Sequence, residues 1–360
     1  MKCIGQFLLL SVVVIYYLCF ETVKLKKIFV NAKIMILLGL LAMQLISCKT
    51  GNKEHILLKN IKIKHIPELS SASGICIYDG NIYLVGDDTP WLYKLDSKFN
   101  ILDSTVISAI DTLIEGRTPK YLKADFECME IISHEDKSEI VIISSGSLPQ
   151  TRDTAYIVSL SDPEIIYSKN LRPLYEIIKQ EAQIISPNEI NIEGIAFSDN
   201  DAYLLHRGNV SENIIIRINR QEFISYIKQQ TAPPEFDIYR FNLPGYKGVT
   251  SGFSGACLNP DKSGLIFTAS IEDTQDEIND GKVLGSFIGI IPFAGLQNGY
   301  FEATLISNNG HLLEKKVEGI TAILSHTKKV KSSMYTKLNI ITVCDNDNGT
   351  SDIITFDLLK

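Results

Sequence analysis

Five short motifs carry the residues of this chain that are best placed to do chemistry. Each motif begins with a serine or a glutamate that precedes an apolar run, and in four of the five a glycine follows directly. The five first residues are Ser73, Glu127, Glu193, Ser254 and Glu318. Carboxylate and hydroxyl oxygens are the ligands that hard cations such as Ca²⁺ prefer. Glu127, Glu193 and Glu318 are therefore candidate metal ligands and candidate catalytic groups, with Ca²⁺ as the expected cofactor.

A second polar cluster follows each motif, after a turn and a second apolar run. With the two serines, these clusters give the candidate ligand-binding residues Ser73, Asp87, Asp88, Ser147, Arg152, Arg207, Asn209, Ser254, Glu272, Asp273 and Asp345. Arg152 and Arg207 suit a phosphate or carboxylate group, and Arg207 could also stabilise an anion that develops during hydrolysis. The alternative is structural, because a serine or glutamate at such a position can bond the backbone and hold neighbouring elements together.

Three further features have both a chemical and a structural interpretation. His206 could form a Ser-His-Asp triad with Ser73 or Ser254, but no nucleophile-elbow motif accompanies these serines. Residues 345–349 resemble a calcium loop, although the glycine comes one position early and the bidentate glutamate is missing, so we favour a simple turn. The acidic segment 272–280 could cover a binding site or form a solvated loop.

The motifs recur at intervals of 54 to 66 residues. Each opens a unit of short β-branched and aromatic runs separated by Asp, Asn and Gly turns, and repeated units of four antiparallel strands are typical of a β-propeller. We therefore predict an all-β fold with a single propeller over residues 56–360, with five four-stranded blades favoured and six as the alternative. The last unit lacks a fourth strand, and the run at 56–66 should supply it and close the ring.

In a propeller, the first strand of each blade lines the central channel. The start of this strand and the end of the antiparallel second strand lie on the same face, so both polar clusters of every unit should meet at one mouth of the channel. Ligands prefer such convergent, concave places. Residues 171–185 and 221–230 have helical periodicity, and we expect them to be insertions and not a separate domain.

Residues 1–47 have the features of a targeting segment. Two apolar runs, 7–20 and 34–47, lie on either side of a group of lysines, and both are shorter than the roughly 20 residues of a membrane-spanning helix. The second run ends in Leu45-Ile46-Ser47-Cys48, which resembles a bacterial lipobox. We expect 1–47 to be a lipoprotein signal peptide, extended by a misplaced start codon, Cys48 to be lipidated, and 48–55 to be the tether. The alternative is a signal anchor with an incidental cysteine.

This processing would place the protein in the cell envelope on a lipid anchor, with the outer membrane favoured. It would also change the charge of the chain. The full sequence has 35 basic and 42 acidic residues, and residues 1–47 contain five of the basic residues and one of the acidic residues. The processed chain would therefore have 30 basic and 41 acidic residues and a net charge of −11. Such an acidic chain is not expected to bind nucleic acid. The four cysteines that follow Cys48 lack the spacing of a disulfide framework. Two of them, Cys76 and Cys257, take equivalent positions in the repeat that suit packing.

Several segments resemble an uncharacterised family of Bacteroidota lipoprotein β-propellers. The resemblance covers nearly all of 56–360, and its main segments are Asp125-Phe126-Glu127, Asn191-Ile192-Glu193-Gly194, 251–256, 267–274 and 281–289. The family is distantly similar to phytase-like and esterase-like propeller domains. The resemblance therefore implies a lipid-anchored propeller, and its distant relatives suggest calcium-assisted hydrolysis of a phosphoester or an ester.

Three functions are compatible with the sequence. We favour a cell-envelope protein whose channel mouth binds a cation or a small polar ligand, because no complete set of nucleophile and base can be read from the chain. The second is a metal-assisted hydrolase in which the three glutamates hold a cation that lowers the pKa of a bound water. The third is an interaction scaffold that uses the outer face of the propeller. Nothing in the sequence indicates an oligomeric state.

Overall fold

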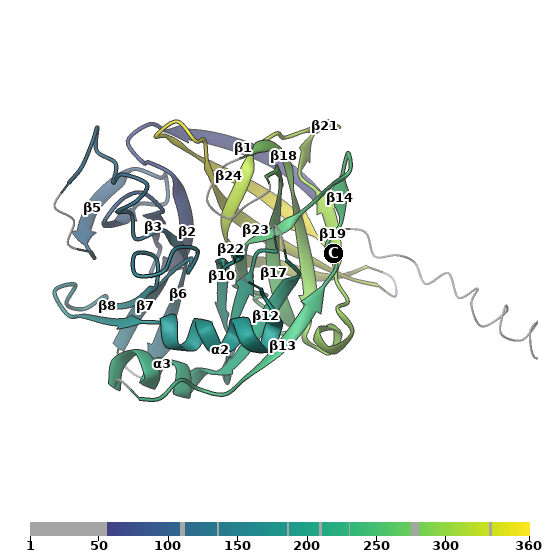
Figure 1. The fold of residues 1–360 in the computed structure, drawn as a ribbon. Helices are drawn as coiled ribbons and strands as arrows, with labels where there is room; N and C mark the ends of the chain where they lie inside the picture. Colours follow the sequence, from purple (N-terminus) through teal and green to yellow (C-terminus); the bar gives the residue numbers. More distant parts are fainter. Residues whose placement is uncertain are drawn as a thin grey trace, which may run out of the picture. The chain divides into compact units, whose positions relative to one another are not determined.

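Five four-stranded antiparallel sheets are arranged around a central channel in the computed structural model (Figure 1). The structure describes residues 56–108, 112–134, 137–185, 187–208, 211–229, 231–274, 281–330 and 333–360. In four of the sheets the strands follow one another in chain order from the channel outwards. The predicted all-β fold with five blades is confirmed, and the alternative of six blades is wrong.

The first three blades are built from consecutive strands. Blade 1 contains β2 (Ala72–Tyr78), β3 (Asn81–Gly86), β4 (Trp91–Leu95) and β5 (Ile101–Val106). Blade 2 contains β6 (Phe126–His134), β7 (Lys137–Ser144), β8 (Thr154–Ser159) and β9 (Ile166–Asn170). Blade 3 contains β10 (Ile192–Phe197), β11 (Asp201–His206), β12 (Asn213–Asn219) and β13 (Phe236–Phe241).

The last two blades complete the ring. Blade 4 contains β16 (Gly252–Leu258), β17 (Gly264–Asp273), β18 (Lys282–Pro292) and β19 (Glu302–Leu305). Blade 5 contains β22 (Lys316–Val330), β23 (Ser333–Asp345), β24 (Ser351–Leu359) and β1 (Leu57–Ile66). Two short hairpins lie between blades: β14 (Gly245–Tyr246) with β15 (Val249–Thr250), and β20 (Ser307–Asn308) with β21 (His311–Leu312).

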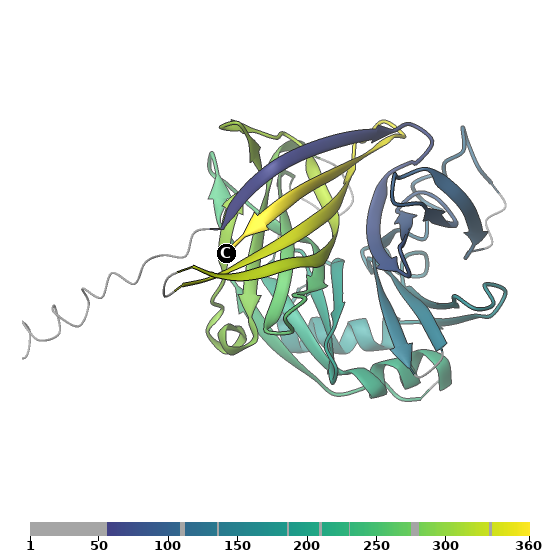
Figure 2. The same ribbon diagram turned by 180° about the vertical axis from the view of Figure 1, so that it is seen from behind.

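The ring is closed by its first strand, as predicted. β1 pairs antiparallel with β24, from Leu57 opposite Leu359 to Ile66 opposite Ser351. Figure 2 shows β1 in purple along the yellow β24, at the outer side of blade 5. Because β1 belongs to blade 5 and the chain then continues into blade 1, the two ends of the propeller are joined by backbone hydrogen bonds, which removes an exposed sheet edge.

A hydrophobic core fills each of the five junctions between blades. The inner strands β2, β6, β10, β16 and β22 contact one another in turn, and β22 contacts β2. Five separate clusters of buried apolar side chains lie at the successive junctions. Cys76, Cys128, Cys257 and Cys344 are buried free thiols that belong to these cores, so they pack as small apolar groups.

Two helices cover the junction of blades 2 and 3. α2 (Arg172–Ala182) buries Tyr175 and α3 (Arg220–Gln229) buries Phe223, both in the core shared by these blades. α2 falls within the predicted helical segment 171–185, and α3 begins one residue before the predicted segment 221–230. The short 3-10 helix η1 (Phe293–Asn298) follows β18. In the described part of the chain, no helix has the length and apolarity needed to cross a membrane.

Candidate functional site

The first residue of each sequence motif lies at a β-bulge. The register between the inner strand and its neighbour shifts at Ser73, Glu127, Glu193 and Ser254, and across the pair Glu318-Gly319 in blade 5. A bulge leaves one residue without a partner in the ladder and turns its side chain away from the regular alternation. The same irregularity in all five blades therefore directs these side chains to one end of the channel.

The glycine after the bulged residue allows neighbouring inner strands to approach closely. A Cβ atom on Gly255 would lie 2.1 Å from the carbonyl oxygen of Glu318, and one on Gly319 would lie 2.4 Å from the carbonyl oxygen of Ser73. Both distances are far below van der Waals contact. The glycines of the motif are thus explained by packing around the channel and not by ligand binding.

The two serines connect neighbouring blades. The Ser73 hydroxyl donates to the carbonyl oxygen of Phe126, and the Ser254 hydroxyl donates to that of Val317 at 2.7 Å. Both side chains are fully buried. Their donors are used within the fold, so the geometry supports the structural interpretation of Ser73 and Ser254 and gives no support to a ligand-binding role.

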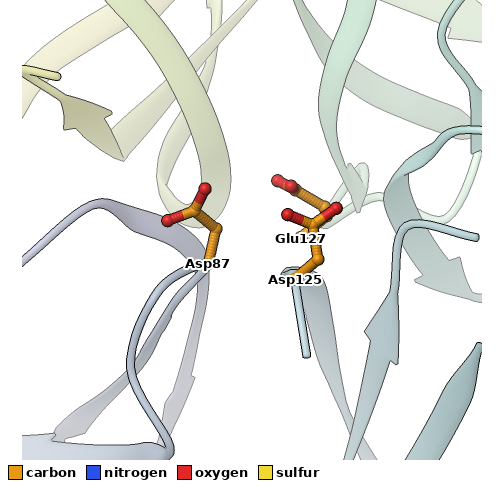
Figure 3. A group of neighbouring side chains, drawn as sticks. All are labelled: Asp87, Asp125 and Glu127. Carbon is orange, nitrogen blue, oxygen red and sulfur yellow. The ribbon is translucent and has the colours of Figure 1, made fainter. Parts of the chain in front are cut away.

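The three glutamates meet at the channel mouth. Glu127, Glu193 and Glu318 each offer a carboxylate oxygen within 4.8 Å of the others, and all three side chains are buried. Asp87, Asp125 and Glu127 form a second such group (Figure 3). Figure 3 shows Asp87 on one side of the gap and Asp125 and Glu127 on the other. Glu127 is thus shared by both groups, and the mouth contains one continuous cluster of carboxylates.

Four basic side chains surround this cluster. Lys123 Nζ contacts Asp87 Oδ2 and lies 2.8 Å from Asp125 Oδ1, and Arg152 Nη1 lies 3.1 Å from Asp125 Oδ2. On the other side, Lys316 Nζ lies 3.1 Å from Glu318 Oε1. Arg207 Nη2 lies 2.7 Å from Glu272 Oε2, while its Nη1 is 3.7 Å from Glu193 Oε1. The predicted Arg152, Arg207 and Glu272 are therefore at the mouth, held in ion pairs.

Acidic groups outnumber basic groups at the mouth. Apart from the separate pair of Asp88 and Arg117, seven carboxylates face these four cations; they belong to Asp87, Asp125, Glu127, Glu193, Glu272, Glu318 and Asp345. The described residues therefore leave three negative charges uncompensated in a largely buried place. Burying unpaired charge is unfavourable, so the site favours protons or a bound cation.

Glu127 is the least satisfied of these carboxylates. It is 9% exposed, and it forms no hydrogen bond or ion pair with any described residue. Burial, reinforced by the charges of Glu193, Asp125 and Glu318, raises its pKa well above the usual range. Burial also raises the pKa of Glu318 well above that range, against the effect of the Lys316 ammonium. Glu127 and Glu318 thus hold protons more strongly than isolated carboxylates would.

Asp345 lies beside the cluster at a pocket. Burial, with a contribution from the Asp87 charge, raises the pKa of Asp345 to about 7. The pocket has a volume of about 370 Å³ and is lined by residues that include Asp87, Arg117, Lys123 and Asp345. Carboxylates that follow strands of blades 1 and 5, those of Asp87 and Asp345, therefore face this pocket.

The remaining predicted residues have structural partners or lie elsewhere. Asp88 is paired with Arg117 and accepts hydrogen bonds from the Ser70 and Ser71 hydroxyls. Ser147 is buried between Arg152 and Asp125. Asp273 is exposed at the end of β17. Asn209 and Cys48 lie outside the described residues, as does 275–280 of the acidic segment.

His206 and the 345–349 segment have structural roles. His206 Nδ1 accepts a hydrogen bond from the backbone of Asn191 at 2.8 Å, and Nε2 lies 2.9 Å from Ser211 Oγ. Burial lowers its pKa to about 4. Neither nitrogen reaches Ser73 or Ser254, which excludes the Ser-His triad. Residues 345–349 form the turn between β23 and β24, as the sequence favoured, with the Asp347 backbone bonded to Asp345 Oδ1.

The sequence interpretation missed three charged residues of the mouth and one amide. These are Asp125, Lys123, Lys316 and Asn191, whose amide donates to Glu193 Oε1 at 2.8 Å. Three of them occupy the same repeat position, two residues before the bulged residue. This recurring polar position, at or just before the start of the inner strand, was a signal that could have found them. Lys123 lies outside the repeat and had no such signal.

The fold and the site define the class of this protein: it is a five-bladed β-propeller with an excess of buried carboxylates at one channel mouth. The chain belongs to the family described as "Family of unknown function (DUF6929)", which matches residues 68–358. No curated protein matches it significantly.

Among solved structures, the chain is similar to virginiamycin B lyase from Staphylococcus aureus, with 12% identity, a TM-score of 0.38, and coverage of 82% of this chain and 99% of that one. It is also similar to the GH43 endo-arabinanase from Bacillus licheniformis, with 12% identity, a TM-score of 0.37, and coverage of 82% and 95%. With TM-scores below 0.5, neither similarity informs the function of this protein.

Proposed function

We propose that the channel mouth binds one divalent cation, with Ca²⁺ as the first candidate, and that this cation holds a small polar ligand. Glu127, Glu193 and Glu318 supply the protein ligands. The observation that carries the proposal is the buried carboxylate of Glu127, which has no partner among the described residues and lies within 4.8 Å of the other two.

The spacing of the carboxylates suits calcium. Ca²⁺ binds oxygen at about 2.3–2.6 Å, so two ligands on opposite sides of one ion are at most about 5 Å apart. The three glutamates satisfy this limit in the structure. Ca²⁺ also accepts irregular geometry and more than six oxygens, which leaves positions for water or for an oxygen of a ligand. A divalent ion would reduce the excess of negative charge at the mouth.

Direct titration tests this proposal. Protein treated with a chelator and dialysed should bind one Ca²⁺ per chain in isothermal titration calorimetry, and the Glu193→Gln variant should bind at least tenfold more weakly. The exposed Glu68 has no role at the mouth, so Glu68→Gln serves as the control and should bind like wild type. Absence of binding by Ca²⁺, Mg²⁺, Mn²⁺ and Zn²⁺ would rule the cation site out.

Metal-assisted hydrolysis of a phosphoester or an ester is a second candidate function. The pocket of about 370 Å³ beside the carboxylates favours it, because Asp345 lines this pocket and has a pKa of about 7 that suits proton transfer. Arg207 could stabilise the developing anion only by leaving its pair with Glu272. Turnover of a panel of chromogenic esters that requires the cation and is lost in Asp345→Asn would establish this activity.

The cellular setting belongs to the same proposal. We place the protein in the cell envelope, as a Bacteroidota-type lipoprotein anchored through Cys48, because the segment before the propeller resembles a lipoprotein signal. Use of the outer face as an interaction scaffold is the third possibility. A scaffold should keep its cellular function when the carboxylate cluster is removed, whereas our proposal predicts that the Glu193→Gln variant loses this function.

A further inference from the structure

Lys123 pairs with two of the three members of one carboxylate group, Asp87 and Asp125. Its ammonium contacts Asp87 Oδ2 from blade 1 and lies 2.8 Å from Asp125 Oδ1 at the start of blade 2. The side chain is 12% exposed, and Glu127 adds to the acidic field around it. An ammonium is a compact point charge with three donors, so it can satisfy several carboxylates at once. Lys123 therefore takes the place that a cation would take between these side chains.

The two carboxylate groups differ in how they are neutralised. In the group of Asp87, Asp125 and Glu127, Lys123 stands between the first two acids. Around Glu127, Glu193 and Glu318, the basic groups pair with single members of the group: Lys316 lies 3.1 Å from Glu318, and Arg207 lies 3.7 Å from Glu193 and 2.7 Å from Glu272. No described basic group pairs with Glu127 itself. The first group is filled from within the chain, and the second is open on the side of Glu127.

We infer that the mouth has two cation positions that share Glu127, that the Lys123 ammonium permanently fills the first, and that only the second is left for a divalent ion. The inference rests on the proposed function and defines its stoichiometry. Two positions that share a bridging carboxylate are the arrangement of two-ion centres, whose ions lie about 3.5–4 Å apart. A fixed positive charge in one of them repels a second ion, so the wild-type protein should hold one ion and not two.

The number of bound ions tests this inference. The wild-type protein, depleted with a chelator and loaded with Ca²⁺, should carry one ion in native mass spectrometry. Lys123→Met removes the ammonium and should carry two. Lys123→Arg keeps a charge between the acids and should carry one. Arg117→Met is the matched control, because it removes another cation of the same mouth that pairs with Asp88, outside both groups, and it should also carry one.

A second pair of variants gives a result even if Lys123→Met fails to fold. Asp87→Asn removes a carboxylate of the group that Lys123 fills and leaves all three glutamates in place, so it should still carry one ion. Glu318→Gln alters only the open group and should lose the ion.

Loss of the ion in Asp87→Asn, or two ions in the wild type, would overturn the inference, as would one ion in folded Lys123→Met. No ion in the wild type would instead contradict the proposed function itself. The two failures are therefore distinguishable.

Discussion

Replacement of Glu127 by glutamine should change stability in opposite directions with and without a divalent cation. Glu127 is buried without a partner, and burial with the charges of Glu193, Asp125 and Glu318 raises its pKa well above the usual range. At pH 8 in chelator, the raised pKa of Glu127 therefore destabilises the folded state. The cost is about 1.4 kcal/mol for each unit by which the pKa in the folded state exceeds that in the unfolded state, counted up to pH 8. Glutamine keeps the shape and removes the charge, so the free energy of unfolding should rise by roughly 1–3 kcal/mol.

The bound ion should reverse this order. A ligand at a hundred times its dissociation constant stabilises the folded state by about 2.7 kcal/mol, which corresponds to roughly 5 °C in Tm for a domain of this size. Wild-type protein should gain this shift in saturating Ca²⁺. Glu127→Gln removes the carboxylate that both groups share, so its Tm should rise by no more than about 1 °C under the same conditions.

Differential scanning calorimetry at pH 8 and constant ionic strength, in EDTA or in excess Ca²⁺, measures both effects. Glu130→Gln is a closely matched control. It lies on the same strand, three residues further along, and lines a different cavity of about 450 Å³ formed by the later residues of all five inner strands. This variant should keep the full Ca²⁺ shift. A full shift in Glu127→Gln, or a lower stability than wild type in EDTA, would refute the reasoning.

Three other expectations follow from the same structure. The pKa of Asp345 is raised to about 7, so the stability that its protonated form contributes is present at pH 4 and is lost as the pH rises through 7. Urea unfolding in EDTA should therefore show that Asp345→Asn becomes more stable relative to wild type as the pH rises over this range. Gly255→Ala places a Cβ 2.1 Å from the Glu318 carbonyl and should lower the free energy of unfolding by roughly 3 kcal/mol, whereas Gly194→Ala, with its nearest contact at 3.1 Å, should cost less. Cys48→Ser should abolish incorporation of labelled palmitate in cells; incorporation at the wild-type level would contradict lipidation at Cys48.

The repeat made the architecture predictable from the sequence. Intervals of 54 to 66 residues between the motifs leave room for four short strands and their turns, and the missing fourth strand of the last unit required the strand at 56–66. The pattern also identified the face of the channel on which the glutamates meet. These properties depend on spacing along the chain, which the sequence displays directly.

The partners of the charged groups could not be predicted in the same way. Lys123 lies 36 residues from Asp87, and Arg207 lies 65 residues from Glu272, so each pair depends on how loops fold over the ring. The bulges, which decide where the side chain of Glu127 points, coincide with the sequence motifs, but the motifs alone do not show that the backbone bulges there. The sequence therefore predicted that the three glutamates meet, but it missed Asp125 and two of the four basic residues that neutralise the cluster.

The order of residues around the ring explains why the site should be single and off-centre. Going round the channel, the bulged positions are Ser73, Glu127, Glu193, Ser254 and Glu318, so Glu318 is flanked by the two serines. The serines use their hydroxyls to join neighbouring strands and add no charge. A carboxylate in either position would add to repulsion that already raises the pKa of Glu127 and Glu318. The fivefold repeat thus supplies the scaffold. Because serine takes the place of glutamate at two of the five positions, the buried negative charge stays within what one divalent ion and the surrounding basic groups would largely balance.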